Sequence, residues 1–244
     1  MLTRTNYVLV HGARHGAWCW ARLRETLIAQ RDKRNVGEVV APDLPGHGAR
    51  KGEDLSRITL QDYVDTVVGE VTSRDLSNVV LVGHSLGGLT APYVAARAAE
   101  RIKRVVFLAC AMPAEGDSMH DMWRKRGRPS PSVRQDGDWA GLTDEQRFRR
   151  MFCNDMEPRM ADWMLKQLTP EPPKVFEEKV TRRDFVGRFP CTYVVHLYDQ
   201  SVPVEEQRAN AMLLGDPEMV DLKAGHDGMM TKPRDVARIL LHYS

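Results

Sequence analysis

The chain has 244 residues, of which 42% are hydrophobic and 28% are charged, so it is long enough and apolar enough to bury a core. Its formal net charge of +2 is too small to indicate a nucleic acid or an anionic membrane as a partner. No stretch reaches the roughly 18 apolar residues that a membrane span needs, and the N-terminus lacks a signal-peptide pattern. We therefore expect a cytoplasmic protein that binds neither nucleic acid nor membrane.

The cysteines are few and widely spaced. There are four, with no CxxC pair among them: Cys19, Cys110, Cys153 and Cys191. Such spacing is typical of reduced thiols and does not indicate a disulfide framework or a zinc site.

Short apolar runs alternate with longer helical patterns. Most of the runs are continuous and β-branched, as in strands buried on both faces of a parallel sheet; they are Tyr7–Val10, Val39–Ala41, Val79–Val82, Val105–Leu108, Tyr193–Val195 and Met219–Leu222. Helical patterns occupy Trp20–Gln30, Thr59–Ser73, Leu86–Glu100 and Val204–Leu214. The alternation predicts an α/β fold with a doubly wound, mostly parallel, six-stranded sheet.

A His-Gly loop, His11-Gly12-Ala13-Arg14-His15-Gly16, follows the first strand. We expect the backbone N–H of Ala13 to face a substrate carbonyl, with His11 and Gly12 beside the substrate, because glycine lets the chain come close. The alternative is a plain turn in which His11 packs structurally. For His15, a supporting role in the loop is favoured over catalysis.

The second strand leads into a loop dominated by proline and glycine, Pro42-Asp43-Leu44-Pro45-Gly46-His47-Gly48. We interpret Asp43 as a side chain that fixes this loop rather than one that binds substrate.

The third strand ends in Gly83-His84-Ser85-Leu86-Gly87, which matches the G-x-S-x-G pattern. The pattern alone is weak evidence, but here it lies between a buried strand and a helix rich in small residues, as the motif requires. We assign Ser85 as the nucleophile and the N–H of Leu86 as the second oxyanion donor. The alternative is a glycine-rich turn in which Ser85 is a helix N-cap.

No convincing buried strand occurs between Met112 and Phe189. Helical stretches at Thr143–Met151 and Glu157–Leu168 occur instead, so we predict a helical cap over residues 112–189, between core segments 1–111 and 190–244. Its large side chains either line an acyl pocket or only pack the cap onto the core, with Trp123, Phe152 and Trp163 as candidates. The basic run from Trp123 to Arg128 is interpreted as a solvated loop.

A neutral serine needs a general base, and the chain has eight histidines. His226 directly follows the last strand and completes the chain order Ser, Asp or Glu, His that goes with this motif. The others fit worse by position, among them His47, His84, His120, His196 and His242.

Asp199 follows the preceding strand, where its carboxylate would orient the imidazole of His226. An Asx turn before Pro203 is the alternative role for Asp199. Asp227, next to the base, is expected to face outward.

Several segments together resemble the plant methylesterase and hydroxynitrile lyase group of α/β-hydrolases and its bacterial esterase relatives. They are Leu9–Trp20, Pro42–Gly48, Gly83–Gly88, Phe152–Asp155 and His226–Met230, and the His-Gly-x-x-His-Gly-Ala-Trp string in the first is the most specific. The resemblance spans nearly the whole chain. It implies a carboxylesterase acting on small methyl esters or a lyase acting on cyanohydrins.

Three positions separate these activities. The resemblance implies that the lyases carry threonine after the first histidine, cysteine after the nucleophile and lysine after the catalytic histidine. Here these positions hold Gly12, Leu86 and Asp227, which favours the esterase. A lyase needs a cation to stabilise departing cyanide, and Asp227 has the wrong sign.

We therefore predict a serine hydrolase of the EC 3.1.1 type. It would cleave a small carboxylic ester, with a methyl ester as one option, through an acyl-enzyme on a Ser85–His226–Asp199 triad, without a metal or organic cofactor. The alternatives are a hydroxynitrile or carbon–carbon lyase on the same triad, or a non-enzymatic receptor for a small ligand. The oligomeric state is left open, with a homodimer as one option.

Overall fold

The computed structural model describes residues 4–127, 129–130 and 133–244. A sheet of six strands forms its centre, every pairing is parallel, and the strand order is β2-β1-β3-β4-β5-β6. The strands are β1 (Thr5–Val10), β2 (Val36–Val40), β3 (Val79–His84), β4 (Ile102–Leu108), β5 (Cys191–His196) and β6 (Glu218–Leu222). The predicted α/β fold and the location of all six strands are confirmed.

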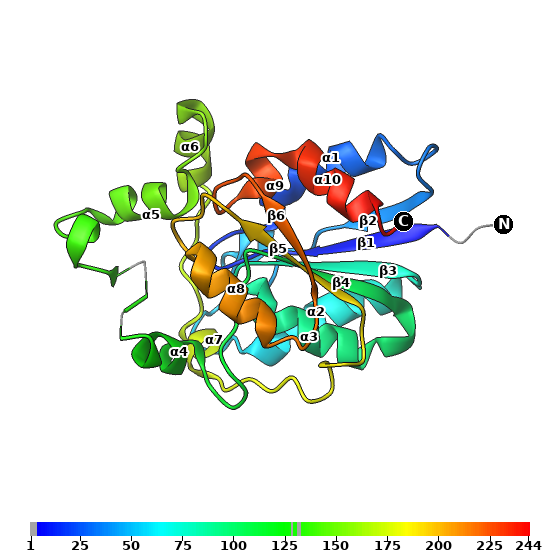
Figure 1. The fold of residues 1–244 in the computed structure, drawn as a ribbon, viewed down its shortest axis with the longest axis horizontal. Helices are drawn as coiled ribbons and strands as arrows, with labels where there is room; N and C mark the ends of the chain where they lie inside the picture. Colours follow the sequence, from blue (N-terminus) through cyan, green and yellow to red (C-terminus); the bar gives the residue numbers. More distant parts are fainter. Residues whose placement is uncertain (1–3, 128, 131–132) are drawn as a thin grey trace.

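Helices cover both faces of this sheet (Figure 1). One face carries α1 (Ala21–Ile28), α9 (Gly228–Thr231) and α10 (Pro233–Leu241), and the other carries α2 (Leu60–Ser73), α3 (Gly87–Arg97) and α8 (Val204–Met212). Each face has its own hydrophobic cluster, which explains why all six residues of β3 and of β5 are buried. Short 3-10 helices lie at Ala17–Trp20, Gly48–Arg50, Ala99–Arg101 and Gly137–Trp139.

The predicted helices lie where the sequence places them, within a few residues at each end. The start of α2 shows why: Thr59 accepts a hydrogen bond from the N–H of Asp62, and the Asp62 side chain accepts one from the N–H of Thr59. The helices without a sequence prediction are α4, α7, α9 and α10, and the first three have only seven, five and four residues. Segments this short are below the length at which helical periodicity can be read.

The segment between β4 and β5, residues 112–189, is called here the inserted segment. It contains α4 (Met119–Lys125), α5 (Asp144–Phe152), α6 (Pro158–Leu165) and α7 (Pro173–Glu177), and no strand occurs among its described residues. Helices α4 and α7 pack into the cluster on the α2, α3 and α8 face, whereas α5 and α6 pack into the opposite cluster. Figure 1 shows these two pairs as separate groups beside the same end of the sheet.

The basic run from Trp123 to Arg128 begins in helix α4 and not in a loop, although Arg124, Lys125 and Gly127 are exposed as the sequence suggested. Trp123 lies in α4 and is half-buried. The Arg126 guanidinium donates to Glu206 Oε2 and Asn210 Oδ1, each at 2.6 Å, and both acceptors lie in α8. Its partners lie 80 and 84 residues further along the chain, so no local pattern could have revealed this contact. Arg128 lies outside the described residues.

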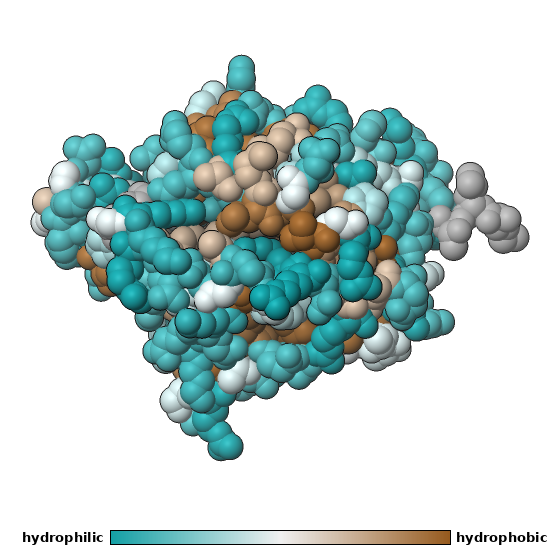
Figure 2. All heavy atoms as spheres, turned by 60° about the horizontal axis from the view of Figure 1, so that its bottom comes forward, coloured by the Kyte–Doolittle hydropathy of each residue, from teal (hydrophilic) through white to brown (hydrophobic). Residues whose placement is uncertain are grey.

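Figure 2 shows a mostly polar face on which hydrophobic residues gather in a band across the middle. In the described part of the chain, no helix is both long and apolar enough to cross a membrane. All four cysteines are free and buried, in agreement with the expected reduced thiols.

Candidate active site

The predicted site residues lie on loops that follow four parallel strands. Ala13 follows β1, Ser85 follows β3, Asp199 follows β5 and His226 follows β6. The carboxyl ends of parallel strands share one edge of a sheet, and β1 and β3 are neighbours whose following helices, α1 and α3, cover opposite faces. Such a change of direction opens a crevice between the two loops, where open α/β sheets bind ligands.

Ser85 occupies a sharp turn between β3 and α3. Its φ of 51° lies in the left-handed region, which few residues other than glycine adopt. The turn is held on both sides: Ser85 N–H donates to the carbonyl of Leu108 at 3.0 Å, and the Ser85 carbonyl accepts from the N–H groups of Gly88 and Ala111. Backbone strain of about 1–3 kcal/mol is typical of such a residue, and it persists only where the surroundings enforce it.

Two glycines allow the chain to close around this serine. A Cβ on Gly87 would lie 2.9 Å from the carbonyl oxygen of Val10, and one on Gly12 would lie 2.7 Å from the Cβ of Ser85. Neither space can hold a methyl group. The loop after β1 and the loop after β3 are therefore in direct contact.

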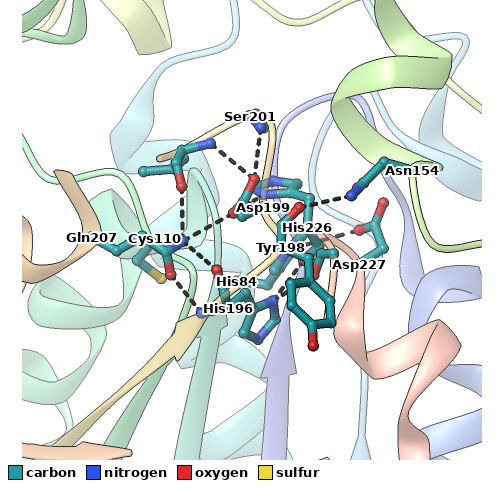
Figure 3. Close-up of polar contacts among 12 residues, drawn as sticks. His84, Cys110, Asn154, His196, Tyr198, Asp199, Ser201, Gln207, His226 and Asp227 are labelled. Atoms are coloured by element: carbon teal, nitrogen blue, oxygen red, sulfur yellow. Dashed lines mark hydrogen bonds and ion pairs between the residues drawn. The ribbon is translucent and has the colours of Figure 1, made fainter. Parts of the chain in front are cut away.

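His226 and Asp199 form a buried pair. His226 Nδ1 lies 2.7 Å from Asp199 Oδ2, and both side chains are fully buried (Figure 3). The other carboxylate oxygen of Asp199 accepts from the N–H groups of Ser201 and Val202, at 2.7 and 2.9 Å. Asp199 therefore makes the turn that was its alternative role and, at the same time, the contact with the imidazole.

The contact with Asp199 determines which nitrogen of His226 is basic. Because Nδ1 donates to the carboxylate, a neutral ring carries its lone pair on Nε2. Burial lowers the pKa of His226, but the charge of Asp199, the hydrogen bond to it and the charge of Asp227 outweigh burial, and the pKa is raised. Nε2 is buried and makes no hydrogen bond to any described residue, Ser85 included.

Two further histidines hold the backbone of this loop, a role that the sequence did not reveal. His84 Nε2 and His196 Nδ1 each lie 3.0 Å from the carbonyl oxygen of His226, so each donates to it. Burial is the largest cause that lowers the pKa of both rings, which keeps them neutral. Sequence position alone could only present them as poorer candidates for the base.

The expectation that Asp227 faces outward is wrong. Its side chain is fully buried, and Oδ1 lies 3.1 Å from Nε2 of His15. Burial raises the pKa of this carboxyl, but the charge and hydrogen bond of His15, with the charges of His84 and His226, lower it to about 2. A partner 212 residues away in the chain makes this burial tolerable, and no local pattern could have identified it.

A cavity adjoins Ser85. Its wall includes Ser85, Leu86 and Ala13, together with apolar side chains of the inserted segment: Met119, Met122, Trp123, Met151, Phe152 and Phe176. The cavity therefore lies between the α4–α7 group and the α5 helix, over the nucleophile. Phe152 also packs against the His226 ring, with centroids 5.5 Å apart.

Only some of the residues predicted to bind substrate line the cavity. Trp123 and Phe152 lie in it, whereas His11, Gly12 and Trp163 do not. His11 is buried, and its Nε2 accepts from the N–H of Leu44 at 3.1 Å, as in its structural alternative. Trp163 is 46% exposed and packs edge-on against Trp18.

Other polar side chains tie the surrounding loops together. Asp43 accepts from the N–H groups of Ala17 and Ala49, at 2.6 and 2.9 Å, so it fixes its loop as expected.

The inserted segment makes similar ties: Asp155 Oδ2 accepts from Gly225 N–H at 2.8 Å, and Asn154 Nδ2 donates to the carbonyl of Tyr198 at 2.7 Å. These two residues belong to the Phe-Cys-Asn-Asp string, which was the only signal in the sequence for this role.

Comparison with known proteins shows that this chain is similar to hydrolases in sequence and in structure. The model of the "Alpha/beta hydrolase family" matches residues 7–239. A carbendazim hydrolyzing esterase of Nocardioides sp. (strain SG-4G) is 28% identical, over 96% of this chain and 98% of the relative. Salicylic acid-binding protein 2 of Nicotiana tabacum is 29% identical, over 97% and 95%. The crystal structure of polyneuridine aldehyde esterase superposes with a TM-score of 0.80 at 25% identity, over 98% of this chain and 99% of that one.

Proposed function

Because the chain belongs to the alpha/beta hydrolase family, we propose that it hydrolyses small carboxylic esters through an acyl-enzyme formed on Ser85. The observation that carries this proposal is Ser85 itself. It lies at a strained turn in the wall of a largely apolar cavity. The buried His226–Asp199 pair is close by, because His84, the last residue of β3 and the neighbour of Ser85, donates a hydrogen bond to the carbonyl of His226. The esterase names of relatives aligned over nearly the whole chain support the same reaction.

The mechanism assigns one role to each group. Nε2 of His226 accepts the hydroxyl proton of Ser85 while Oγ forms a bond to the ester carbonyl carbon. The N–H groups of Ala13 and Leu86 stabilise the oxyanion, and Asp199 stabilises the imidazolium. His226 returns the proton to the alcohol as the carbon–oxygen bond breaks. Water then attacks the acyl-enzyme by the same proton transfers and releases the acid.

Proton transfer requires the Ser85 hydroxyl to meet Nε2. A staggered change of χ1 moves a serine hydroxyl without moving the backbone, and hydrogen bonds at active sites often tighten only when substrate is bound. The unpartnered Nε2 is the atom that this movement would satisfy.

The largely apolar wall favours an ester with an apolar acyl group, of which a methyl ester is one example, and Arg14, Arg126 and Glu206 also line the cavity. Met119, Met122 and Met151 have flexible side chains that adapt to substrates of different shape. Trp123 and Phe152 supply flat surfaces for the acyl portion.

A panel of p-nitrophenyl esters with short acyl chains tests the proposal. Wild type is expected to hydrolyse them, and Ser85→Ala and His226→Ala are each expected to lose at least about a thousand-fold in kcat/KM. His242→Ala is a suitable control, because this histidine is exposed near the C-terminus. A Ser85→Ala protein that keeps the wild-type rate would contradict the proposal.

The lyase alternative has a distinct readout. The position after His226 holds a buried carboxylate paired with His15, so it presents no cation to departing cyanide. Incubation with mandelonitrile is therefore expected to release benzaldehyde no faster than buffer does. A protein that binds small ligands without turnover would fail both assays.

A further inference from the structure

A second buried carboxylate belongs to the residue that follows the proposed base in the chain, and the proposed mechanism does not use it. Asp227 follows His226 in the chain, its side chain is fully buried, and it is absent from the cavity wall. Oδ1 lies 3.1 Å from His15 Nε2 and 3.7 Å from His84 Nε2. A buried carboxylate is costly unless it is paired, so this arrangement needs a physical reason.

The hydrogen bonds of His15 indicate its charge. Nδ1 lies 2.7 Å from the carbonyl oxygen of Ala13, and Nε2 lies 3.1 Å from the Asp227 carboxylate. Both neighbours only accept hydrogen bonds, so both ring nitrogens donate and the ring is an imidazolium. The pair therefore contains one buried positive and one buried negative charge.

The same bonds link two loops of the site. His15 and Ala13 belong to the loop after β1, and Asp227 belongs to the loop after β6 that carries His226. Packing reinforces the link, because the His15 ring stacks on Trp18 and meets Phe152 edge-on, each with centroids 5.1 Å apart. A shift of Asp227 would move His15 and the carbonyl group of Ala13 that His15 contacts. The N–H of Ala13, the proposed oxyanion donor, would move with them.

Of the carboxylates around His226, Asp227 is the second that raises its pKa, after Asp199. Asp199 faces Nδ1 from the loop after β5. His84 on β3 and His196 on β5 donate to the His226 carbonyl as neutral rings. Cys19 and Cys153 face Asp227 from the loop after β1 and from the end of α5, and burial keeps both thiols protonated.

We propose that Asp227 is a positioning residue for the reaction: through His15 it fixes the loop of Ala13 against the loop of His226, and its charge stabilises the imidazolium of His226. This inference rests on the proposed function of Ser85, His226 and Asp199. Asp227 touches no substrate and transfers no proton.

Two substitutions with opposite electrostatic effects test the proposal. Asp227→Asn removes the negative charge, so the acid limb of the kcat/KM profile is expected to move to lower pH by about half a unit. His15→Gln removes the balancing cation and is expected to move the same limb to higher pH. In both proteins kcat is expected to fall about ten-fold or more, with a smaller change in KM. The substitution displaces the oxyanion donor, which stabilises the transition state more than the bound substrate.

Asp221→Asn is the matched control, because it removes the same charge at an exposed position on β6. Its pH profile and kcat are expected to equal those of wild type. If Asp227→Asn does not fold, His15→Gln and Asp227→Glu carry the test, the latter expected to keep the wild-type acid limb. Acid limbs that stay at the wild-type pH, or that move in the same direction in both variants, overturn the proposal.

The failure of this inference is distinguishable from failure of the proposed function. If wild type hydrolyses no ester and Ser85→Ala makes no difference, the proposed function fails, and this inference fails with it. If wild type is active, Ser85→Ala is inactive and Asp227→Asn behaves like Asp221→Asn, only the role of Asp227 is rejected.

Discussion

Ser85 combines a backbone conformation that sequence patterns can anticipate with contacts that they cannot. G-x-S-x-G after a strand predicts the tight turn, and the φ of 51° agrees with it. The glycines are needed because the carbonyl of Val10 and the Cβ of Ser85 fill the space where their side chains would be. That reason is visible only when β1 and β3 lie side by side.

His226 leads to a prediction about pH at the scale of single residues. Although burial lowers its pKa, Asp199 and Asp227 raise it, so the folded value lies above the ordinary value of about 6.5. Below the raised value the imidazole is protonated and cannot accept the Ser85 proton. We expect kcat/KM to fall with one proton as pH decreases through a midpoint above about 6.5.

A pH series of ester hydrolysis from pH 4 to 9 measures this midpoint. Asp199→Asn removes the larger supporting charge, so its acid limb is expected at lower pH than that of wild type. A wild-type rate that is flat down to pH 4 would show that His226 is not the base.

Residue roles were predictable to the extent that they follow a strand end. Ser85 and Asp199 follow buried strands and His226 follows the edge strand β6, and the structure brings Asp199 and His226 into contact. Asp227 was misplaced because its partner, His15, is remote in the chain. Trp163 was misplaced because a helix can turn a tryptophan toward the cavity or toward solvent, and composition does not distinguish the two.

At the scale of elements, the inserted segment is hydrogen-bonded to the loop after β1. Glu171, between α6 and α7, accepts from the N–H of Arg14 at 2.7 Å, and Thr169 N–H donates to the carbonyl of Arg14 at 3.0 Å. Arg14 has a φ of 65° and directly follows Ala13. Glu171 also accepts from the Tyr63 hydroxyl at 2.9 Å, so α2 holds the carboxylate in place.

Glu171→Gln is therefore expected to reduce both stability and activity. Loss of a charged acceptor from a buried hydrogen bond costs about 1–3 kcal/mol, and the loosened loop should lower kcat by about ten-fold. Chemical denaturation and steady-state kinetics measure these effects. Glu177→Gln, at an exposed position at the end of α7, is the control, and equal behaviour of the two variants would contradict the role of Glu171.

Elements were predictable where they are long and regular. The parallel strands have continuous apolar runs, and α2 has a capping box that marks its start. The helices of the inserted segment are shorter, and their partners lie on two different core clusters. A sequence pattern shows which face is apolar but not which cluster receives it, so the cavity between α4, α7 and α5 could not be outlined in advance.

At the scale of the whole molecule, the cysteines provide a test of the packing. All four are free and buried, and burial raises the pKa of Cys153 to about 12 and that of Cys191 to about 11. Neutral, inaccessible thiols react slowly. We expect Ellman's reagent to titrate almost no thiol in the native protein and four after unfolding in guanidinium chloride.

A native protein that releases the chromophore within the mixing time would show that at least one of these side chains is accessible. Fewer than four thiols after unfolding would instead indicate a disulfide. Cys153→Ser with the same reagent shows whether Cys153 is the accessible thiol.

The global fold was the most predictable feature, because six strand-like runs alternating with helices allow few arrangements other than a doubly wound sheet. The resemblance to esterases and lyases then limited the expected reaction to two types, and the candidate residues at the strand ends located the site at one edge of that sheet. What remained beyond prediction was the charge pairing within the core, where His15, Asp227 and Glu171 act across long sequence separations.

Reaction with a fluorophosphonate probe tests the central assignment most directly, since the probe forms a covalent bond to an activated serine. Peptide mass spectrometry of the labelled wild type is predicted to locate the modification on Ser85. Labelling is predicted to disappear in Ser85→Ala and to slow at least about a hundred-fold in His226→Ala. Modification of a different residue, or labelling of His226→Ala at the wild-type rate, would contradict the account.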